Sequence, residues 1–187
     1  LSQWNFGVDS GMYPLGSCTM KYNPKINERQ AALNGFTGAH SLLPVELCQG
    51  TLKLMFELER YLAEITGLPA VTLQPAAGSH GELTGMMIIY AYHKNQGKAR
   101  SKVLIPDTAH GTNPASATLC GFQSIPVKSD NQGILSVETI AELMDEDTAG
   151  IMITNPNTLG LFEKNINKIT EIVHSKGGLV YGDGANM

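Results

Sequence analysis

The chain has 187 residues, of which 42% are hydrophobic and 16% are charged, which excludes disordered and fibrous proteins and allows a buried core. Thirteen Lys and Arg residues against seventeen Asp and Glu residues give a net charge of −4 with no basic stripe, so nucleic acid is not an expected partner. The longest apolar stretch, around residues 86–92, is far shorter than the roughly 20 residues that a membrane-spanning helix needs.

The first 68 residues contain two different patterns. Residues 1–44 are rich in Gly, Pro, Asn and Ser but carry too many apolar side chains for a disordered tail, which predicts an ordered, extended arm. Apolar residues then recur at steps of three and four, which predicts an amphipathic helix over residues 45–68 that Gly67 and Pro69 end.

Strand and helix patterns alternate over residues 69–187. This alternation predicts an α/β fold with a mostly parallel sheet covered by helices. The chain begins with Leu1 and ends where a strand would pass into a loop, so we expect a single incomplete domain, cut from a longer protein. Strands are predicted at residues 70–74, 102–105, 123–127, 150–154 and 178–181, and helices at 81–95, 113–120, 137–145 and 163–175.

A small-residue turn, Gly78-Ser79-His80, follows the first predicted strand and opens the next helix. Backbone N–H groups at such a helix start can hold an anion. The turn lacks the Lys-Ser/Thr pair of a P-loop and the three-glycine spacing of a dinucleotide site, so it suits a single phosphomonoester. The alternative is an ordinary strand-to-helix turn.

Two further candidates follow predicted strands, where ligands of open α/β sheets bind. His110 has small neighbours that leave room for a flat ligand, although a lone histidine is more often structural. Asp183 ends an apolar strand, where a carboxylate is costly unless it meets a cation or hydrogen-bond donors. A protonated pyridine nitrogen would fit, and a helix N-cap is the alternative.

The remaining candidates carry weaker signals. Residues 155–160 form at least a turn, which could offer Thr158 to a ligand. Three widely spaced cysteines, Cys18, Cys48 and Cys120, argue against disulfides and against a metal site and favour a reducing, cytoplasmic setting. Cys18 lies in the arm and could be an exposed thiol.

Five stretches together resemble the glycine dehydrogenase (decarboxylating) family, the P-proteins of glycine cleavage systems, and most closely subunit 2 of its two-subunit form. They are GMYPLGSCTMKYNPKINE, LQPAAGSHGELTG, PDTAHGTNPASA, ITNPNTLGLFE and YGDGANM, and they span nearly the whole chain. The resemblance implies the large domain of a fold-type-I enzyme that uses pyridoxal 5′-phosphate. It further implies an oxidoreductase that decarboxylates glycine and transfers the aminomethyl group to the lipoyl group of an H-protein, in an oligomer with subunit 1.

The same resemblance assigns roles to individual residues. Gly78, Ser79 and His80 would hold the cofactor phosphate, and His110 would stack on its ring. Asp183 would pair with the pyridinium nitrogen and Asn186 would reach the ring hydroxyl. Other residues expected near the cofactor or the substrate are Thr112, Thr158, Ser17, Cys18 and His40.

Two departures from the family pattern limit these expectations. His40 is followed by Ser41, where relatives usually carry proline, which weakens a role for His40. The family's Schiff-base lysine would lie beyond Met187, so this piece alone is predicted to be inactive. The alternatives are another fold-type-I enzyme, such as a cysteine desulfurase, and a non-catalytic scaffold subunit.

Overall fold

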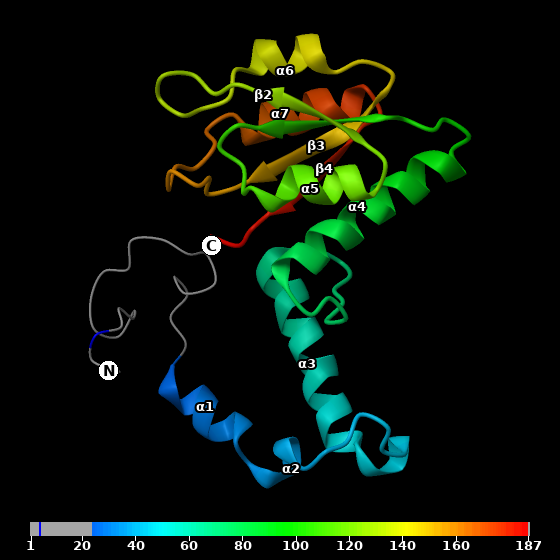
Figure 1. Cartoon of the computed structure of the whole chain (residues 1–187), viewed down its shortest axis with the longest axis vertical. Coiled ribbons are helices and arrows are strands. Elements are labelled where there is room, and N and C mark those ends of the chain that lie inside the picture. The colour runs from blue at the N-terminus through cyan, green and yellow to red at the C-terminus, as the bar shows by residue number, and fades with distance from the viewer. Residues whose placement is uncertain (1–3, 5–23, 187) are drawn as a thin grey trace. The chain divides into compact units, whose positions relative to one another are not determined.

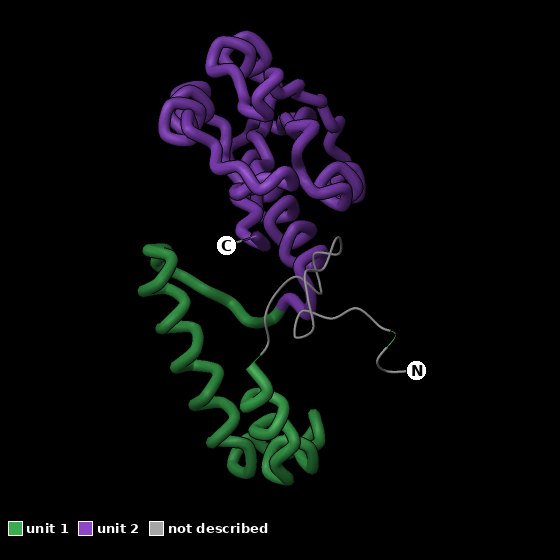
Figure 2. The backbone as a smooth tube through the Cα atoms, turned by 90° about the vertical axis from the view of Figure 1, so that its left-hand side faces the viewer, with its two compact units in different colours: residues 1–74 green, residues 75–187 purple. Residues whose placement is uncertain are grey.

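The computed structural model describes residue 4 and residues 24–186, and the chain divides into two compact units, residues 1–74 and residues 75–187 (Figure 1, Figure 2). None of the helices in the described residues combines the length and the apolarity that crossing a bilayer requires. Each unit is described by itself below.

The described part of the first unit contains helices joined by irregular segments. Two short helices, α1 (Lys25–Ala31) and α2 (Asn34–Thr37), replace the extended conformation predicted for this part of the arm. Glu28 in the first turn of α1 and Arg29 in its last turn complement the helix dipole, a signal that the turn-rich composition obscured. Half of the predicted arm, residues 1–3 and 5–23, lies outside the described residues.

The predicted amphipathic helix is confirmed as α3 (Gln49–Thr66). A 3-10 turn, η2 (Val45–Leu47), occupies the residues where the sequence pattern already indicated helix. The helix ends where Gly67 takes a left-handed conformation, with φ of 69°, which glycine adopts without steric cost. No residue of α3 is buried.

The second unit contains a parallel four-stranded sheet with the order β2-β1-β3-β4. Four of the five predicted strands are confirmed, and the mostly parallel sheet is confirmed with them. The strands are β1 (Lys102–Pro106), β2 (Gln123–Val127), β3 (Thr148–Thr154) and β4 (Leu179–Asp183).

Helices cover both faces of this sheet (Figure 1). One core cluster joins Met86 and Ile89 of α4 and Ala117 of α5 to one face of the strands. A second cluster joins Ile140 of α6 and Ile169 of α7 to the other face. The covering helices are α4 (Gly78–Asn95), α5 (Thr112–Leu119), α6 (Val137–Leu143) and α7 (Ile166–Ser175).

The strand predicted at residues 70–74 is wrong, since these residues adopt no regular structure. Val71 and Leu73 are half-buried while Thr72 and Gln74 are exposed. The apolar and polar residues of this segment therefore alternate in exposure as they would in a strand, although no strand forms. A strand also needs a neighbour for its N–H and C=O groups. Among the described residues, none of the four strands pairs with this segment.

A close approach between β3 and β4 depends on Gly150. This residue pairs with Leu179, and a Cβ atom at position 150 would lie 2.0 Å from the Leu179 carbonyl oxygen. Only a residue without a side chain lets the two strands pair at this point.

Candidate functional site

The candidate residues of the second unit gather at the carboxyl ends of the central strands. Strand β3 ends at Thr154, strand β4 ends at Asp183, and His110 follows the end of β1. Because the three strands are parallel and adjacent, their carboxyl ends meet at the same edge of the sheet.

Asp183 is a buried carboxylate, with 8% of its surface exposed. Its Oδ2 accepts a hydrogen bond of 3.3 Å from the Thr154 hydroxyl, and its Oδ1 accepts one of 3.0 Å from the Ala185 amide. Both donors are neutral. The carboxylate therefore has the hydrogen bonds that burial demands and keeps further acceptor capacity for a cation.

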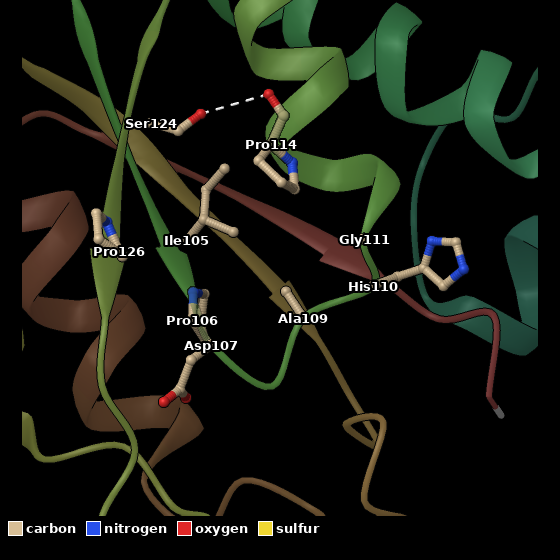
Figure 3. A pocket seen from close by; sticks show the side chains of 9 residues that line it. All are labelled: Ile105, Pro106, Asp107, Ala109, His110, Gly111, Pro114, Ser124 and Pro126. Atoms are coloured by element: carbon tan, nitrogen blue, oxygen red, sulfur yellow. Dashed lines mark hydrogen bonds between the residues drawn. The ribbon is translucent and has the colours of Figure 1, made fainter.

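The hydroxyl of Thr154 also connects Asp183 to His110. The His110 amide donates a 3.1 Å hydrogen bond to Thr154 Oγ1, and that oxygen lies 3.3 Å from Asp183 Oδ2. The His110 side chain is 40% exposed. Its ring points away from the other residues shown in Figure 3. The structure thus brings His110 and Asp183 to the two sides of one buried hydroxyl.

Glu82 is a second buried carboxylate, and sequence analysis did not single it out. Its side chain accepts hydrogen bonds from Thr112 Oγ1 at 2.7 Å and from Ser116 Oγ at 3.1 Å. The Asn113 amide, with its nitrogen turned toward Glu82, donates at 3.2 and 3.3 Å to the two carboxylate oxygens. Its oxygen then lies 3.3 Å from Thr154 Oγ1, so Asn113 and Asp183 share the one proton of that hydroxyl. Thr112 also contacts His110 Nδ1 at 2.7 Å, so Glu82 is joined to the histidine through one hydroxyl.

The sequence did carry a signal for Glu82. The buried residues of α4 are Glu82, Met86, Ile89 and His93, which is the spacing of one helix face. An acidic residue on an otherwise mostly apolar face must find donors inside the fold. Thr154, Asn113 and Ser116 carried no comparable signal, because short polar residues are frequent at strand ends and in helix turns.

Tyr181 of β4 lies close to both carboxylates. Burial raises the pKa of its phenol to about 12, and the negative charges of Asp183 and Glu82 add to the effect. Its ring packs against Gly85 of α4, where a Cβ atom would come within 2.6 Å of two ring carbons. The phenol therefore stays neutral beside the two acids.

The predicted phosphate turn forms the first turn of α4 and is not a separate loop. Gly78, Ser79 and His80 are exposed helical residues, and Ala77 at the N-cap makes no side-chain hydrogen bond to them. The N–H groups of this turn therefore remain open to an anion. Glu82, only two residues after His80, ties this end of α4 to Thr112 and the His110 network.

Thr158 and Asn186 hold the surrounding loops. The Thr158 hydroxyl donates a 2.9 Å hydrogen bond to the Thr108 carbonyl oxygen, which joins the loops after β3 and β1. The Asn186 amide nitrogen donates at 3.0 Å to the Pro156 carbonyl oxygen. Both side chains thus have local partners at the same edge of the sheet.

Of the candidates in the first unit, His40 lies in the described loop between α2 and η2. His40 Nδ1 accepts a 3.0 Å hydrogen bond from the Leu42 amide, as in a local turn. Ser17 and Cys18 lie outside the described residues. Within the part of the chain that the structure describes, no cluster of three or more His, Cys, Asp or Glu side chains is arranged to hold a metal ion.

A mainly apolar cavity of about 430 Å³ has His110 among its lining residues (Figure 3). Ile105, Pro114 and Pro126 are among its lining residues, and Ser124 donates a 3.4 Å hydrogen bond to the Pro114 carbonyl oxygen at its rim. The His110 ring does not point into it. The cavity and the polar network therefore share His110, while the other residues named in the network do not line the cavity.

Comparison with known proteins identifies close sequence relatives, although no family model matches the chain. Over its whole length it is 58% identical to a probable glycine dehydrogenase (decarboxylating) subunit 2 of Caldanaerobacter subterraneus and to one of Thermotoga maritima. It covers 39% and 40% of these proteins, so it spans about two fifths of their length. The resemblance expected from the five motifs is confirmed.

Solved structures agree on the fold. A glycine decarboxylase (P-protein) of the glycine cleavage system superposes with a TM-score of 0.71 at 22% identity, covering 85% of this chain and 35% of that one. A NifS-like protein gives 0.69 at 16% identity, covering 90% and 47%. The Oryza sativa protein TDC, solved with PLP and tryptamine, gives 0.60 at 14% identity, covering 73% and 34%. The predicted fold class, part of a fold-type-I large domain, is confirmed.

Proposed function

We propose that Gly78, Ser79, His110 and Asp183 form part of the cofactor site of a pyridoxal 5′-phosphate-dependent glycine dehydrogenase (decarboxylating). The observation that carries the proposal is the 58% identity, over the entire chain, to proteins of that name. The whole protein would release the glycine carboxylate as CO₂ and pass the aminomethyl group to a lipoylated H-protein. It would work in the cytoplasm as an oligomer with a subunit 1.

The residues of the second unit fit this cofactor in three respects. The open N–H groups at Gly78 and Ser79 suit a phosphate dianion, because the start of α4 carries partial positive charge. Asp183 is buried yet held only by neutral donors, which suits a pyridinium nitrogen. The half-exposed ring of His110 is free to stack on a flat ligand.

The chemistry depends on where these residues hold protons. Pyridoxal phosphate, when bound, supplies an electron sink for the electrons that a departing carboxylate leaves on Cα. An anionic Asp183 would stabilise the proton on the pyridine nitrogen of the cofactor, and a protonated ring accepts these electrons more readily. The Thr154 hydroxyl orients the Asp183 carboxylate. The His110 side chain, stacked on the pyridine ring of the cofactor, would limit the movement of that ring. The Schiff-base lysine would be supplied from beyond residue 187.

The function is tested on the full-length protein, purified with its subunit 1 and with H-protein. We expect exchange of labelled CO₂ into the glycine carboxyl group and a cofactor that borohydride traps on the protein. Asp183→Asn should lower the exchange rate by about 100-fold or more, the effect typical of removing a preorganised charge.

Asp147→Asn is the matched control for this substitution. Asp147 accepts hydrogen bonds from the Ser101 amide and hydroxyl, at the opposite end of the strands, and should leave exchange unchanged. Absence of glycine-dependent exchange and of trapped cofactor in the unaltered complex would reject the proposal. Release of sulfur from cysteine would instead favour a desulfurase.

A further inference from the structure

The contacts of Thr112 set the direction of a short proton relay. Thr112 Oγ1 lies 2.7 Å from Glu82 Oε1 and 2.7 Å from His110 Nδ1. A hydroxyl has one proton to donate, and an ionised carboxylate can only accept. With Glu82 ionised, the Thr112 proton goes to Glu82, and the hydroxyl oxygen must then accept from the histidine.

The other neighbours of Glu82 agree with this direction. Ser116 donates to Oε2 at 3.1 Å. In the amide orientation that satisfies both ends of its side chain, Asn113 also turns its nitrogen toward both oxygens, so every one of these neighbours acts as a donor. Glu82 itself is 5% exposed and receives these hydrogen bonds inside the fold. The Thr112 amide also approaches His110 Nδ1, but at 3.4 Å this contact is much weaker than the 2.7 Å hydroxyl contact.

We propose that Glu82 is a positioning residue that, through Thr112, keeps the ring proton of His110 on Nδ1. The hydrogen bond between His110 Nδ1 and Thr112 Oγ1 restrains the rotation of the imidazole ring, because Glu82 holds that hydroxyl in place. Among the described residues, Nε2 has no hydrogen-bond partner. The ring thus presents Nε2 as an acceptor to whatever occupies the site.

The stacking of His110 on a cofactor rests on the proposed function, but the position of the proton on the His110 ring does not. A stacked histidine works best when its plane is fixed before the cofactor arrives, because ordering it during binding costs rotational entropy. Glu82 acts on that plane through Thr112, from the buried face of α4.

The test uses NMR of the full-length subunit, labelled with ¹⁵N-histidine and free of cofactor and glycine. His110→Gln identifies the His110 resonances by their loss. We expect His110 with its proton on Nδ1 and a bare Nε2. Glu82→Met and Thr112→Val each remove one step of the relay. They should lower the ratio of the Nδ1–H to the Nε2–H form about fivefold, which corresponds to one hydrogen bond of typical strength.

Ser116→Ala is the matched control. It removes a hydrogen bond to Glu82 Oε2 but leaves the contacts of Oε1 with Thr112 intact, so the ratio should not change. A parent protein with the proton on Nε2, or a ratio unmoved in both relay variants, would overturn the proposal. Because neither cofactor nor substrate is present, this result is independent of whether the protein decarboxylates glycine.

Discussion

Thr154 shows how one residue can couple two parts of a site. Its side chain is 4% exposed, it accepts from the His110 amide and it lies within hydrogen-bond distance of Asp183. A β-branched side chain in a strand has few χ1 choices, so the hydroxyl stays where both neighbours need it. The positions of the histidine backbone and of the acid are therefore interdependent.

Tyr181 leads to a prediction about alkaline stability. Burial, with the charges of Asp183 and Glu82, raises the pKa of its phenol from 10.0 to about 12. Between these values the unfolded chain has released the phenolic proton while the folded chain keeps it. The free energy of unfolding should therefore fall as pH rises from 10 to 12, by at most about 2.7 kcal/mol and less because the side chain is partly exposed.

Denaturant unfolding at a series of pH values measures this loss. Tyr181→Phe should remove most of it, whereas Tyr90→Phe, which alters a tyrosine that is 44% exposed on α4, should leave it in place. An equally steep alkaline loss in Tyr181→Phe and the parent protein would show that other groups cause it.

At the scale of elements, the sequence predicted those parts of the fold whose signals are local. The three- and four-residue spacing of apolar side chains in α3 and the apolar residues of β1 to β4 were sufficient to predict these elements, because each pattern lies within one segment. The strand prediction at residues 70–74 failed because a strand needs a neighbouring strand to pair with, and no local sequence pattern specifies that neighbour. The start of α4 was placed three residues late because Gly78 and Gly81 are weak helix formers.

The candidate site was predictable only in part for the same reason. His110 and Asp183 stand out as polar residues that follow apolar strands. The relay through Glu82 and Thr112 joins residues 30 positions apart, and it becomes visible only when α4 and α5 are packed together. Sequence patterns give the groups at strand ends but not the contacts between helices.

The packing of α4 against β4 yields a prediction from two glycines of the same helix. Gly85→Ala would place a Cβ atom 2.6 Å from the Tyr181 ring, whereas Gly81→Ala would meet nothing within 4 Å. Alanine favours a helix over glycine by up to about 1 kcal/mol, so Gly81→Ala should stabilise the fold. Gly85→Ala should destabilise it by about 1–2 kcal/mol because overpacking exceeds that gain.

Chemical denaturation at neutral pH compares the two variants directly. Gly81→Ala controls for helix propensity, and only Gly85→Ala should also change the near-ultraviolet circular dichroism of the tyrosines. Stability for Gly85→Ala equal to that of Gly81→Ala would mean that α4 and β4 are packed less closely than the structure indicates.

At the scale of the whole molecule, both units expose apolar helix faces. In the first unit, α3 exposes Leu54, Tyr61 and Ile65, at 56%, 60% and 78%. In the second unit, Ile88 and Leu119 are 62% and 76% exposed. Exposed apolar helix faces of this kind are typical of an interaction site or of a protein that tends to associate.

We therefore expect residues 1–187, prepared alone, to self-associate as concentration rises and to bind a hydrophobic dye. Sedimentation velocity and dye fluorescence measure the two effects. Replacing Ile88 and Leu119 by lysine should reduce both without altering the buried core, since neither side chain belongs to it. A chain that stays monomeric and binds no dye at high concentration would contradict this expectation.

The close approach of Gly150 to Leu179 limits which mutations this position can accept during evolution. With a carbonyl oxygen 2.0 Å from where any Cβ would stand, a mutation there must either open the β3–β4 ladder or be lost from the population. Homologous genes that encode the same sheet should therefore retain a glycine codon at this position even where the neighbouring codons have diverged.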